Sequence, residues 1–375
     1  MPKLSTGLVL SGGGARAAYQ VGALQAINKI LDQPQQSPFD ILTGISAGAI
    51  NSCVLATHNH QFSEGIGRLA QVWGQFQPNQ VYRTDFAHLS RNLMHWLWGM
   101  AKPKQQTKEP MALLDNTPLK ELLSKVLELD SIQNNIEQGN LTAVCTTAYD
   151  YNTGDSVSFY QGTEALDNWQ RFRRRGQADK LTVEHLLASS AIPMVFPSTA
   201  IDGTHYGDGA MRFLTPLSPA LHLGSRKLLV ITVNPLNVEE QLHITTPSLG
   251  DISGHLLNSI FIDSLESDIE RLIRVNQLLE HIPQEDTIKD KLSLKPIDAL
   301  ILSPSIDPAE LAGRYFKELP RGLKFFFKRM GIADDKGESI LSYLLFYAPF
   351  TKHLMQIGYE DTMAEATAVK EFFLE

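Results

Sequence analysis

A G-x-S-x-G spacing, formed by Gly44, Ser46 and Gly48, is the feature that most constrains how this chain can fold. It follows the apolar run 39–42 and precedes the small and apolar residues 49–56, a pattern typical of a strand that turns sharply into a helix. Glycines on either side of the serine leave room for such a turn, which would expose the hydroxyl at the edge of a sheet. The start of the following helix would direct unpaired N–H groups to the same place. The spacing therefore predicts a nucleophilic Ser46 supported by Gly44 and Gly48.

Three consecutive glycines lie upstream, between a strand predicted at 7–11 and a predicted helix. Glycines at such a junction allow the backbone to present several N–H groups to an anion. Gly12, Gly13 and Gly14 could hold a dinucleotide pyrophosphate, could hold the oxyanion of an acyl-transfer intermediate, or could serve packing alone. A dinucleotide loop needs an acidic residue at the end of the second strand, whereas here that strand ends in the serine turn. We therefore expect an oxyanion loop, which Arg16 either stiffens or equips to attract an anionic head group.

A glycine-flanked aspartate, Asp208, follows the strand-like residues 204–206 and precedes Gly209. Such a turn can place a carboxylate at the edge of a sheet, facing a site. Close to Ser46, an ionised Asp208 could accept the serine proton and return it to a leaving group. A free aspartate has a pKa of about 3.9, which is low for a base near neutral pH, so we expect a desolvated site that raises it. An ordinary Asp–Gly turn is the alternative.

The run 188–197, A-S-x-x-x-P-x-x-F-P, closes an amphipathic segment and is interpreted as a proline-ended helix with an apolar wall for a long-chain substrate. Together with the glycine loop that includes Arg16, the serine turn and the Asp208 turn, it resembles the patatin-like phospholipase family. The resemblance covers residues 7–220. It implies a Ser–Asp dyad that hydrolyses acyl esters of lipids through an acyl-enzyme. In this reading Ser46 is the nucleophile, Asp208 is the base, and the three glycines form the oxyanion hole.

Several alternatives stay open beside the dyad. A Ser–His triad is one, because triads are recognised by geometry rather than by order in the sequence. His205 could pack near the site, although no histidine after Asp208 stands in a glycine-rich turn. The same dyad could also transfer the acyl group to an alcohol or thiol, or the chain could bind lipid with a vestigial site. Ala210, where the family often has a glycine, is a minor departure.

Composition narrows the function classes. The 375 residues can bury a large core, and a net charge of −8 argues against nucleic acid as a partner. Cys53 and Cys145 lie in apolar runs, which favours buried thiols over a disulfide. His58 and His60 lack companions at ligand spacing, so we expect no metal and no other cofactor. Without a signal-peptide core or an apolar span of ~20 residues, the expected location is the cytoplasm.

Strand-like and helix-like segments alternate along the chain, which predicts a layered α/β domain with a largely parallel sheet. The resemblance to patatin-like phospholipases implies three layers, α/β/α, around a mostly parallel central sheet. The predicted strands are 7–11, 39–43, 141–148, 156–160, 204–207, 227–234 and 297–303. The predicted helices are 16–31, 47–58, 63–75, 117–127, 182–190 and 252–281. We assign residues 1–310 to a patatin-like catalytic domain and residues 311–375 to a helical C-terminal cap packed on the same domain.

Three stretches bear on contact with lipid. Residues 91–104 combine Trp96 and Trp98 with basic neighbours, which suits a membrane interface, a lid or a buried helix. Residues 314–330 interleave phenylalanines with lysines and arginines, either to dock on anionic head groups or to form a solvated face over the core. Residues 171–175, R-F-R-R-R, are interpreted as a surface loop that could hold a phosphate. We expect a lipid or acyl-ester substrate, peripheral membrane contact and no nucleic-acid partner.

Overall fold

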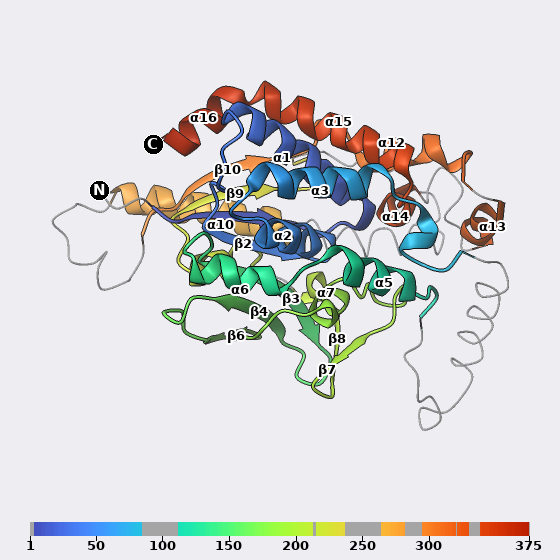
Figure 1. Ribbon diagram of the computed structural model, residues 1–375, viewed down its shortest axis with the longest axis horizontal. Helices are drawn as coiled ribbons and strands as arrows, with labels where there is room; N and C mark the ends of the chain where they lie inside the picture. Colours follow the sequence, from blue (N-terminus) through green and yellow to red (C-terminus); the bar gives the residue numbers. More distant parts are fainter. Residues whose placement is uncertain are drawn as a thin grey trace.

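The strands that the structure describes form one large sheet flanked by helices (Figure 1). The structure is a computed structural model, which describes residues 4–84, 112–212, 215–236, 264–281, 295–319, 321–329 and 338–374. The sheet has ten strands in the main order β10-β9-β1-β2-β3-β4-β6-β5, with β8 paired to β3 and β7 paired to β8. This mixed α/β architecture confirms the predicted fold class, and helices follow it at the C-terminal end of the chain.

Five neighbouring strands, from β10 to β3, are parallel. The strands are β1 (Thr6–Leu10), β2 (Ile41–Ile45), β3 (Ala143–Asp150), β4 (Ser156–Gly162), β5 (Trp169–Arg171), β6 (Arg174–Ala178), β7 (Thr199–Ile201), β8 (Thr204–Asp208), β9 (Lys227–Ile231) and β10 (Asp298–Leu302). All five residues of β1, β2 and β9 are buried, as expected for parallel strands covered on both faces. Leu10 pairs with both Gly44 and Ile231, so the carboxyl ends of these strands meet at one edge.

Helices connect and cover the strands. They are α1 (Ala18–Ile30), α2 (Ala47–Thr57), α3 (Phe62–Gly74), α5 (Thr117–Val126), α6 (Asp130–Glu137), α7 (Val183–Ser189), α8 (Ser218–His222), α10 (Ser264–His281), α12 (Pro308–Phe316), α13 (Arg321–Arg329), α14 (Glu338–Leu344), α15 (Ala348–Ala364) and α16 (Ala366–Leu374). Short 3₁₀ turns are η1 (Gly14–Ala17), η2 (Pro78–Gln80) and η4 (Gly209–Arg212). Among the described helices, none combines the length and the apolar character that a bilayer span requires.

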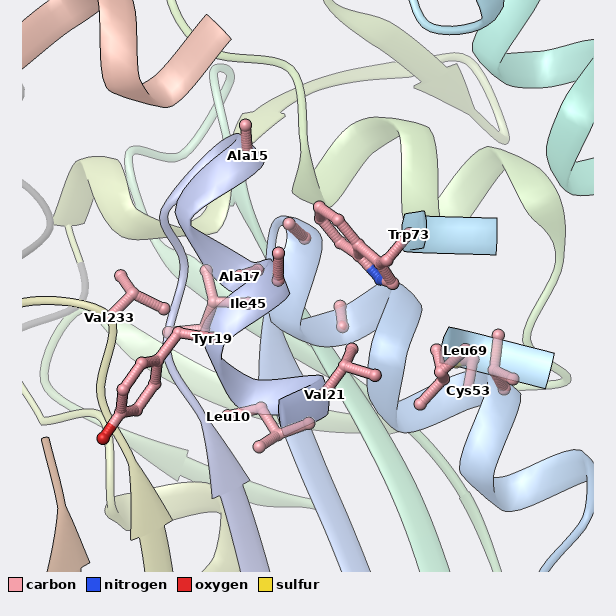
Figure 2. Packing of buried hydrophobic residues seen from close by; sticks show 14 of the residues in the cluster. Leu10, Ala15, Ala17, Tyr19, Val21, Ile45, Cys53, Leu69, Trp73 and Val233 are labelled. Atoms are coloured by element: carbon pink, nitrogen blue, oxygen red, sulfur yellow. The ribbon is translucent and has the colours of Figure 1, made fainter. Parts of the chain in front are cut away.

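The core lies where β1 and β2 meet α1, α2 and α3. Buried side chains from these elements pack together beside the edge that carries the serine turn; they include Leu10, Tyr19, Val21, Ile45, Cys53, Leu69 and Trp73 (Figure 2). Cys53 and Cys145 are both buried free thiols, and burial raises the pKa of each to about 12. Packed side chains of this kind fix the positions of the elements that carry the site.

The last long helix, α15, lies along α1 at the surface of the molecule (Figure 1). Two glycines permit this contact. A Cβ atom on Gly22 would lie 1.8 Å from the carbonyl oxygen of Met355, and one on Gly358 would lie 2.1 Å from that of Tyr19. The two backbones therefore touch, and the end of the chain packs on its beginning. The boundary drawn at residue 310 falls within α12, and the division into 1–310 and 311–375 stays a prediction.

Some sequence predictions differ from the structure. Of residues 171–175, interpreted as a surface loop, only 172–173 form an exposed turn. Arg171 ends β5, and Arg174 and Arg175 begin β6, where Arg175 is held by ion pairs to Asp150 at 3.0 Å and Asp155 at 3.4 Å. Those ion pairs explain why a run of arginines can form a strand. Helices α6 and α8 and the short strand β7 were not predicted, because brief segments carry a weak periodic signal.

Two predicted segments lie wholly or partly outside the residues that the structure describes. Residues 91–104 lie outside the described ranges, as does the part of the predicted helix 252–281 that precedes α10. In the basic segment 314–330, Phe327 is buried whereas Phe325 is exposed, so the phenylalanines divide between the core and the surface.

Candidate active site

The turn at Ser46 has the strained geometry that the glycine spacing predicts. Ser46 joins β2 to α2 with φ 54° and ψ −127°, which is rare for a residue with a side chain. A Cβ atom on Gly44 would lie 2.3 Å from the carbonyl oxygen of Gly48. A Cβ atom on Gly48 would lie 2.4 Å from that of Leu10 and 2.5 Å from that of Ser11. Both glycines are therefore required for the tight turn and for the approach of α2 to the glycine loop.

A serine from a distant segment fixes the backbone of this turn. The amide of Ser46 donates to Ser189 Oγ at 2.9 Å, and Ser189 Oγ donates to the carbonyl oxygen of Thr147 at 2.6 Å. Ser189 ends α7, within the segment 188–197 that we interpreted as an apolar wall. Sequence reasoning missed this role, although a polar Ser189–Ser190 pair at the end of an apolar helix was a usable signal.

Sheet pairing brings Asp208 to the serine. Ala148 of β3 pairs with Asp208 of β8, one position beyond the pairing of Thr147 with Ile45 of β2. The amide of Asp208 donates to the carbonyl oxygen of Ala191 at 2.9 Å. A Cβ atom on Gly209 would lie 2.1 Å from the carbonyl oxygen of Thr147, so the Asp–Gly turn requires its glycine.

The carboxyl group of Asp208 is completely buried. Burial raises its pKa from 3.8 to about 7, while hydrogen bonds from the Ala210 amide and the Ser46 hydroxyl lower it. The amide of Ala210 reaches Oδ1 at 2.9 Å, so the alanine at this position keeps the turn intact. Oδ2 is buried and has no hydrogen-bond partner by distance and angle within the described part of the chain. The carboxylate thus has one oxygen anchored by the backbone and one available to the serine.

The glycine loop lies directly beside the serine turn, because Gly48 contacts the backbone of Leu10 and Ser11. Gly14 has φ 53°, and a Cβ atom there would lie 2.2 Å from the carbonyl oxygen of Tyr343. Within the described ranges, the amides of Gly12 to Gly14 make no backbone hydrogen bond outside regular elements. These amides therefore have no backbone partner of that kind at the carboxyl edge of the sheet.

Arg16 is 2% exposed and holds the loop from behind. Its Nε donates to Ser342 Oγ at 2.7 Å, its Nη1 donates to Asn234 Oδ1, and its guanidinium lies 4.1 Å from the ring centroid of Tyr343. Burial rules out the alternative in which Arg16 attracts a head group at the surface. Asn234, Ser342 and Tyr343 had no local sequence signal, since Ser342 is 326 positions from Arg16.

A buried chain of hydrogen bonds links three helices to the same loop. Trp73 Nε1 donates to Asn51 Oδ1 at 2.8 Å, and Asn51 Nδ2 donates to Gln20 Oε1 at 3.0 Å. Gln20 Nε2 in turn donates to the carbonyl oxygen of Ser11 at 2.8 Å. Each amide both donates and accepts, so the network fixes α1, α2 and α3 against the loop at little desolvation cost.

An apolar cavity of about 50 Å³ begins at Ser46 and runs between α2, α3 and α5. Its walls are almost entirely hydrocarbon; they include Ile50, Val54, Leu69, Val72, Trp73, Leu119, Leu122, Leu123, Ile192, Phe196 and Phe346. Phe196 belongs to the segment 188–197, in agreement with the apolar wall expected there. Phe346 comes from the C-terminal part of the chain.

The described histidines are engaged elsewhere. His205 is paired with Ser198 Oγ at 3.1 Å, and His185 caps its own helix by accepting from the amide of Thr182 at 3.1 Å. Burial and two neighbouring arginines lower the pKa of His222, which stacks on Trp169, to about 4. No hydrogen bond joins a histidine to Ser46 within the described residues, which favours the dyad over a triad.

The sequence profile described as Patatin-like phospholipase matches residues 8–221, more than half of the chain. The chain therefore belongs to the patatin-like phospholipase family, a class of lipid acyl hydrolases. The matched region contains the glycine loop, the serine turn, the segment 188–197 and Asp208.

Matches among solved structures include VipD from Legionella pneumophila, at 11% identity and a TM-score of 0.31, with 94% of this chain and 67% of that chain covered. Human GIVD cytosolic phospholipase A2 in complex with methyl gamma-linolenyl fluorophosphonate matches at 12% identity and a TM-score of 0.40, with 99% and 60% covered. A chain in the complex of SpcU with ExoU from Pseudomonas aeruginosa matches at 14% identity and a TM-score of 0.27, with 97% and 77% covered. The chain thus spans about 60% of the length of the human protein. No curated protein sequence matches it.

Proposed function

We propose that this protein hydrolyses fatty-acyl ester bonds of lipids through an acyl-enzyme on Ser46, with Asp208 as the base. The observation that carries the proposal is the Ser46 hydroxyl beside a fully buried carboxyl group whose pKa is raised to about 7. A base with a pKa near the working pH combines a useful ionised fraction with enough basicity to take a proton. Family membership supports a lipid ester as the substrate class.

The geometry suggests a two-step reaction. Ionised Asp208 accepts the Ser46 proton as Oγ attacks the ester carbonyl carbon, and the carbonyl oxygen becomes an oxyanion beside the amides of Gly12 to Gly14. The intermediate collapses, and Asp208 returns the proton to the departing alcohol, which leaves an acyl ester on Ser46. Asp208 then takes a proton from water, whose oxygen attacks this ester. The second intermediate releases the free acid, and the proton returns to Ser46.

The apolar cavity supports an acyl chain as the group that binds. It starts at Ser46 and offers almost no polar atoms, so a polar head group would lose its hydrogen bonds there. A buried methylene contributes about 0.8 kcal/mol, which favours a hydrocarbon chain in this position. The head group would then remain on the open side of Ser46, near the carboxyl edge of the sheet.

The first test compares three single variants with the parent on a soluble p-nitrophenyl ester and on phospholipid vesicles, with chelator present. We expect Ser46→Ala to lower kcat/KM by more than about 10³ and Asp208→Asn to lower it by about 10²–10⁴. Ser52→Ala is the matched control, because Ser52 lies in the same helix, is buried, and has no hydrogen-bond partner among the described residues. Mass spectrometry of the parent should find the acyl adduct on Ser46.

The outcomes separate the competing functions. Equal turnover by parent and variants, or none by any of them, would overturn the hydrolase proposal. If the acyl group passes to added glycerol or a thiol in preference to water, the protein is an acyltransferase that uses the same dyad. Unchanged vesicle binding by all forms without any ester cleavage would indicate a lipid-binding protein.

A further inference from the structure

Phe172 lies at the tip of the β5–β6 hairpin and is 89% exposed. Arg171 and Arg173 flank it, and the Arg173 guanidinium lies 5.9 Å from the centroid of its ring. Arg173 has φ 58°, so the chain reverses sharply at this point. An aromatic ring at a projecting turn with basic neighbours is a composition that suits the boundary between lipid head groups and acyl chains.

The corner around this tip is basic in an otherwise acidic protein. It holds five arginines and three carboxylates; they are Arg171, Arg173, Arg174, Arg175, Arg212, Asp150, Asp155 and Asp268. Asp150 and Asp155 pair with Arg175, Asp155 also lies 3.8 Å from Arg173, and Asp268 interacts with Arg174. The side chains of Arg173 and Arg212 lie close together, both within 4 Å of a Cβ built on Gly154. The corner therefore carries a local excess of positive charge, although the chain has a net charge of −8.

The hairpin tip and the dyad share one edge of the sheet. Arg174 pairs with Ser156, Ser156 pairs with Tyr149, and Tyr149 pairs with Gly207, which adjoins Asp208. Three strand spacings separate β8 from β6, which amounts to about 14 Å. The hairpin tip and Asp208 therefore lie about this distance apart along the same edge of the sheet.

Two further exposed apolar side chains lie at this edge. Tyr151 follows β3, is 44% exposed, and donates from its hydroxyl to the sulfur of Met211, just after the Asp208 turn. Met194 is 56% exposed and lies two residues before Phe196, which lines the cavity. Exposed apolar groups thus occur at the hairpin tip, beside the Asp208 turn and next to a residue of the cavity wall.

We propose that this edge docks on the surface of an anionic lipid bilayer, with the aromatic tip inserted among acyl chains and the arginines on lipid phosphates. The docking edge consists of Tyr151, Phe172, Met194, Arg171, Arg173 and Arg212. The inference rests on the proposed function, because docking of this edge would hold Ser46 against the layer that contains the ester. It also gives the basic run 171–175 a phosphate-binding role.

Sedimentation with vesicles tests the docking edge. We expect the parent to bind vesicles of phosphatidylcholine with phosphatidylglycerol more tightly than vesicles of phosphatidylcholine alone, and binding to weaken with added salt. Neutralising both flanking arginines in Arg171→Gln/Arg173→Gln should weaken binding more than tenfold, at about fivefold per charge. The single variant Phe172→Ser should bind both kinds of vesicle more weakly than the parent does.

Matched controls come from the opposite end of the strands. Leu278 is exposed on α10 near the contact of Asn276 with the start of β10, and Lys370 is exposed on α16. Leu278→Ser and Lys370→Gln remove the same kinds of group and should bind vesicles as the parent does. Equal binding by parent and docking-edge variants, or loss of binding by the controls as well, would overturn the proposal.

Two readouts keep docking separate from catalysis. Phe172→Trp should show a blue-shifted emission when anionic vesicles are added, relative to the same addition to the parent, and an unchanged spectrum would contradict insertion. Turnover of a soluble ester is the reference for the dyad. Vesicle binding that depends on the edge, without any ester turnover, would uphold docking and defeat the proposed hydrolysis. If the parent turns over the soluble ester but docking-edge variants bind vesicles as the parent does, the docking proposal fails and the proposed hydrolysis stands.

Discussion

The carboxyl group of Asp208 is fully buried, and burial raises its pKa from 3.8 to about 7 against hydrogen bonds from Ala210 and Ser46. The proposed reaction requires the ionised form. We therefore expect kcat/KM for a soluble ester to rise about tenfold per pH unit below pH 7 and to level off above it. A pH–rate profile checks this, and a flat profile between pH 5 and pH 8 would contradict the role of Asp208 as base.

The raised pKa of Asp208 also predicts how the stability of the Asp208→Asn variant depends on pH. Because the folded pKa lies above the unfolded one, folded Asp208 keeps its proton between about pH 4 and pH 7, and stability falls as the pH rises through that window. Asp208→Asn removes this penalty, so it should be more stable than the parent at pH 8, by up to about 4 kcal/mol, with no gain near pH 4. Urea unfolding at both pH values measures the difference. An inactive but stabilised variant would show that its lost turnover is not a folding defect.

At the scale of elements, a close backbone contact joins α2 to the glycine loop. A methyl group on Gly48 would lie 2.4 Å from the carbonyl oxygen of Leu10, so Gly48→Ala must push α2 away from the loop. We expect it to destabilise the fold by about 1–3 kcal/mol and to lower kcat on a soluble ester, since the turn and the loop lose their alignment.

Gly67→Ala is the matched substitution in a neighbouring helix. A Cβ on Gly67 has no atom within 4 Å, and the residue is exposed in the middle of α3. This variant should be as active as the parent and more stable by up to about 1 kcal/mol, because alanine favours helix. Thermal unfolding and ester turnover of both variants check the pair, and similar behaviour of the two would contradict the steric argument.

Elements differed in how well local pattern predicted them. Strands such as β1 and β9, and the helices that follow the glycine loop and Ser46, lie within a few residues of the predicted ranges, because long apolar runs and glycine turns are strong local signals. The β5–β6 hairpin was missed because its arginines are stabilised by Asp150 and Asp155 from another hairpin. When a strand is stabilised by charged residues of another segment, its own sequence lacks the apolar pattern by which strands are predicted.

At the scale of the whole molecule, the C-terminal part of the chain reaches the candidate site. Ser342 accepts from Arg16 at 2.7 Å, Tyr343 touches Gly14, and Phe346 lines the cavity. All three lie beyond residue 221, where the match to the family profile ends. The glycine loop is therefore supported by residues that the family motifs do not include.

Ser342→Ala tests that support. It removes a buried acceptor of the Arg16 guanidinium and should destabilise the fold by about 2 kcal/mol. Because the loop would be less well fixed, we expect kcat on a soluble ester to fall more than KM changes. Ser342→Thr keeps the hydroxyl and should restore kcat, whereas Ser52→Ala loses no hydrogen bond and should leave both constants unchanged. If Ser342→Ala and the parent have the same kcat, the contact between Ser342 and Arg16 does not help to position the glycine loop.

By itself, the sequence determined the local geometry around single residues. The turn at Ser46 and the loop at Gly14 follow from glycines that prevent clashes with nearby backbone, and such constraints are written within a few positions of the chain. Tertiary structure alone decided which of these pieces meet. Strands β2 and β8 both pair with β3, which brings Asp208 to Ser46, and the fold buries Asp208 deeply enough to raise its pKa. Contacts such as Ser46 with Ser189 or Arg16 with Ser342 join residues 143 and 326 positions apart, and no local pattern predicts them because they form only when distant elements pack together.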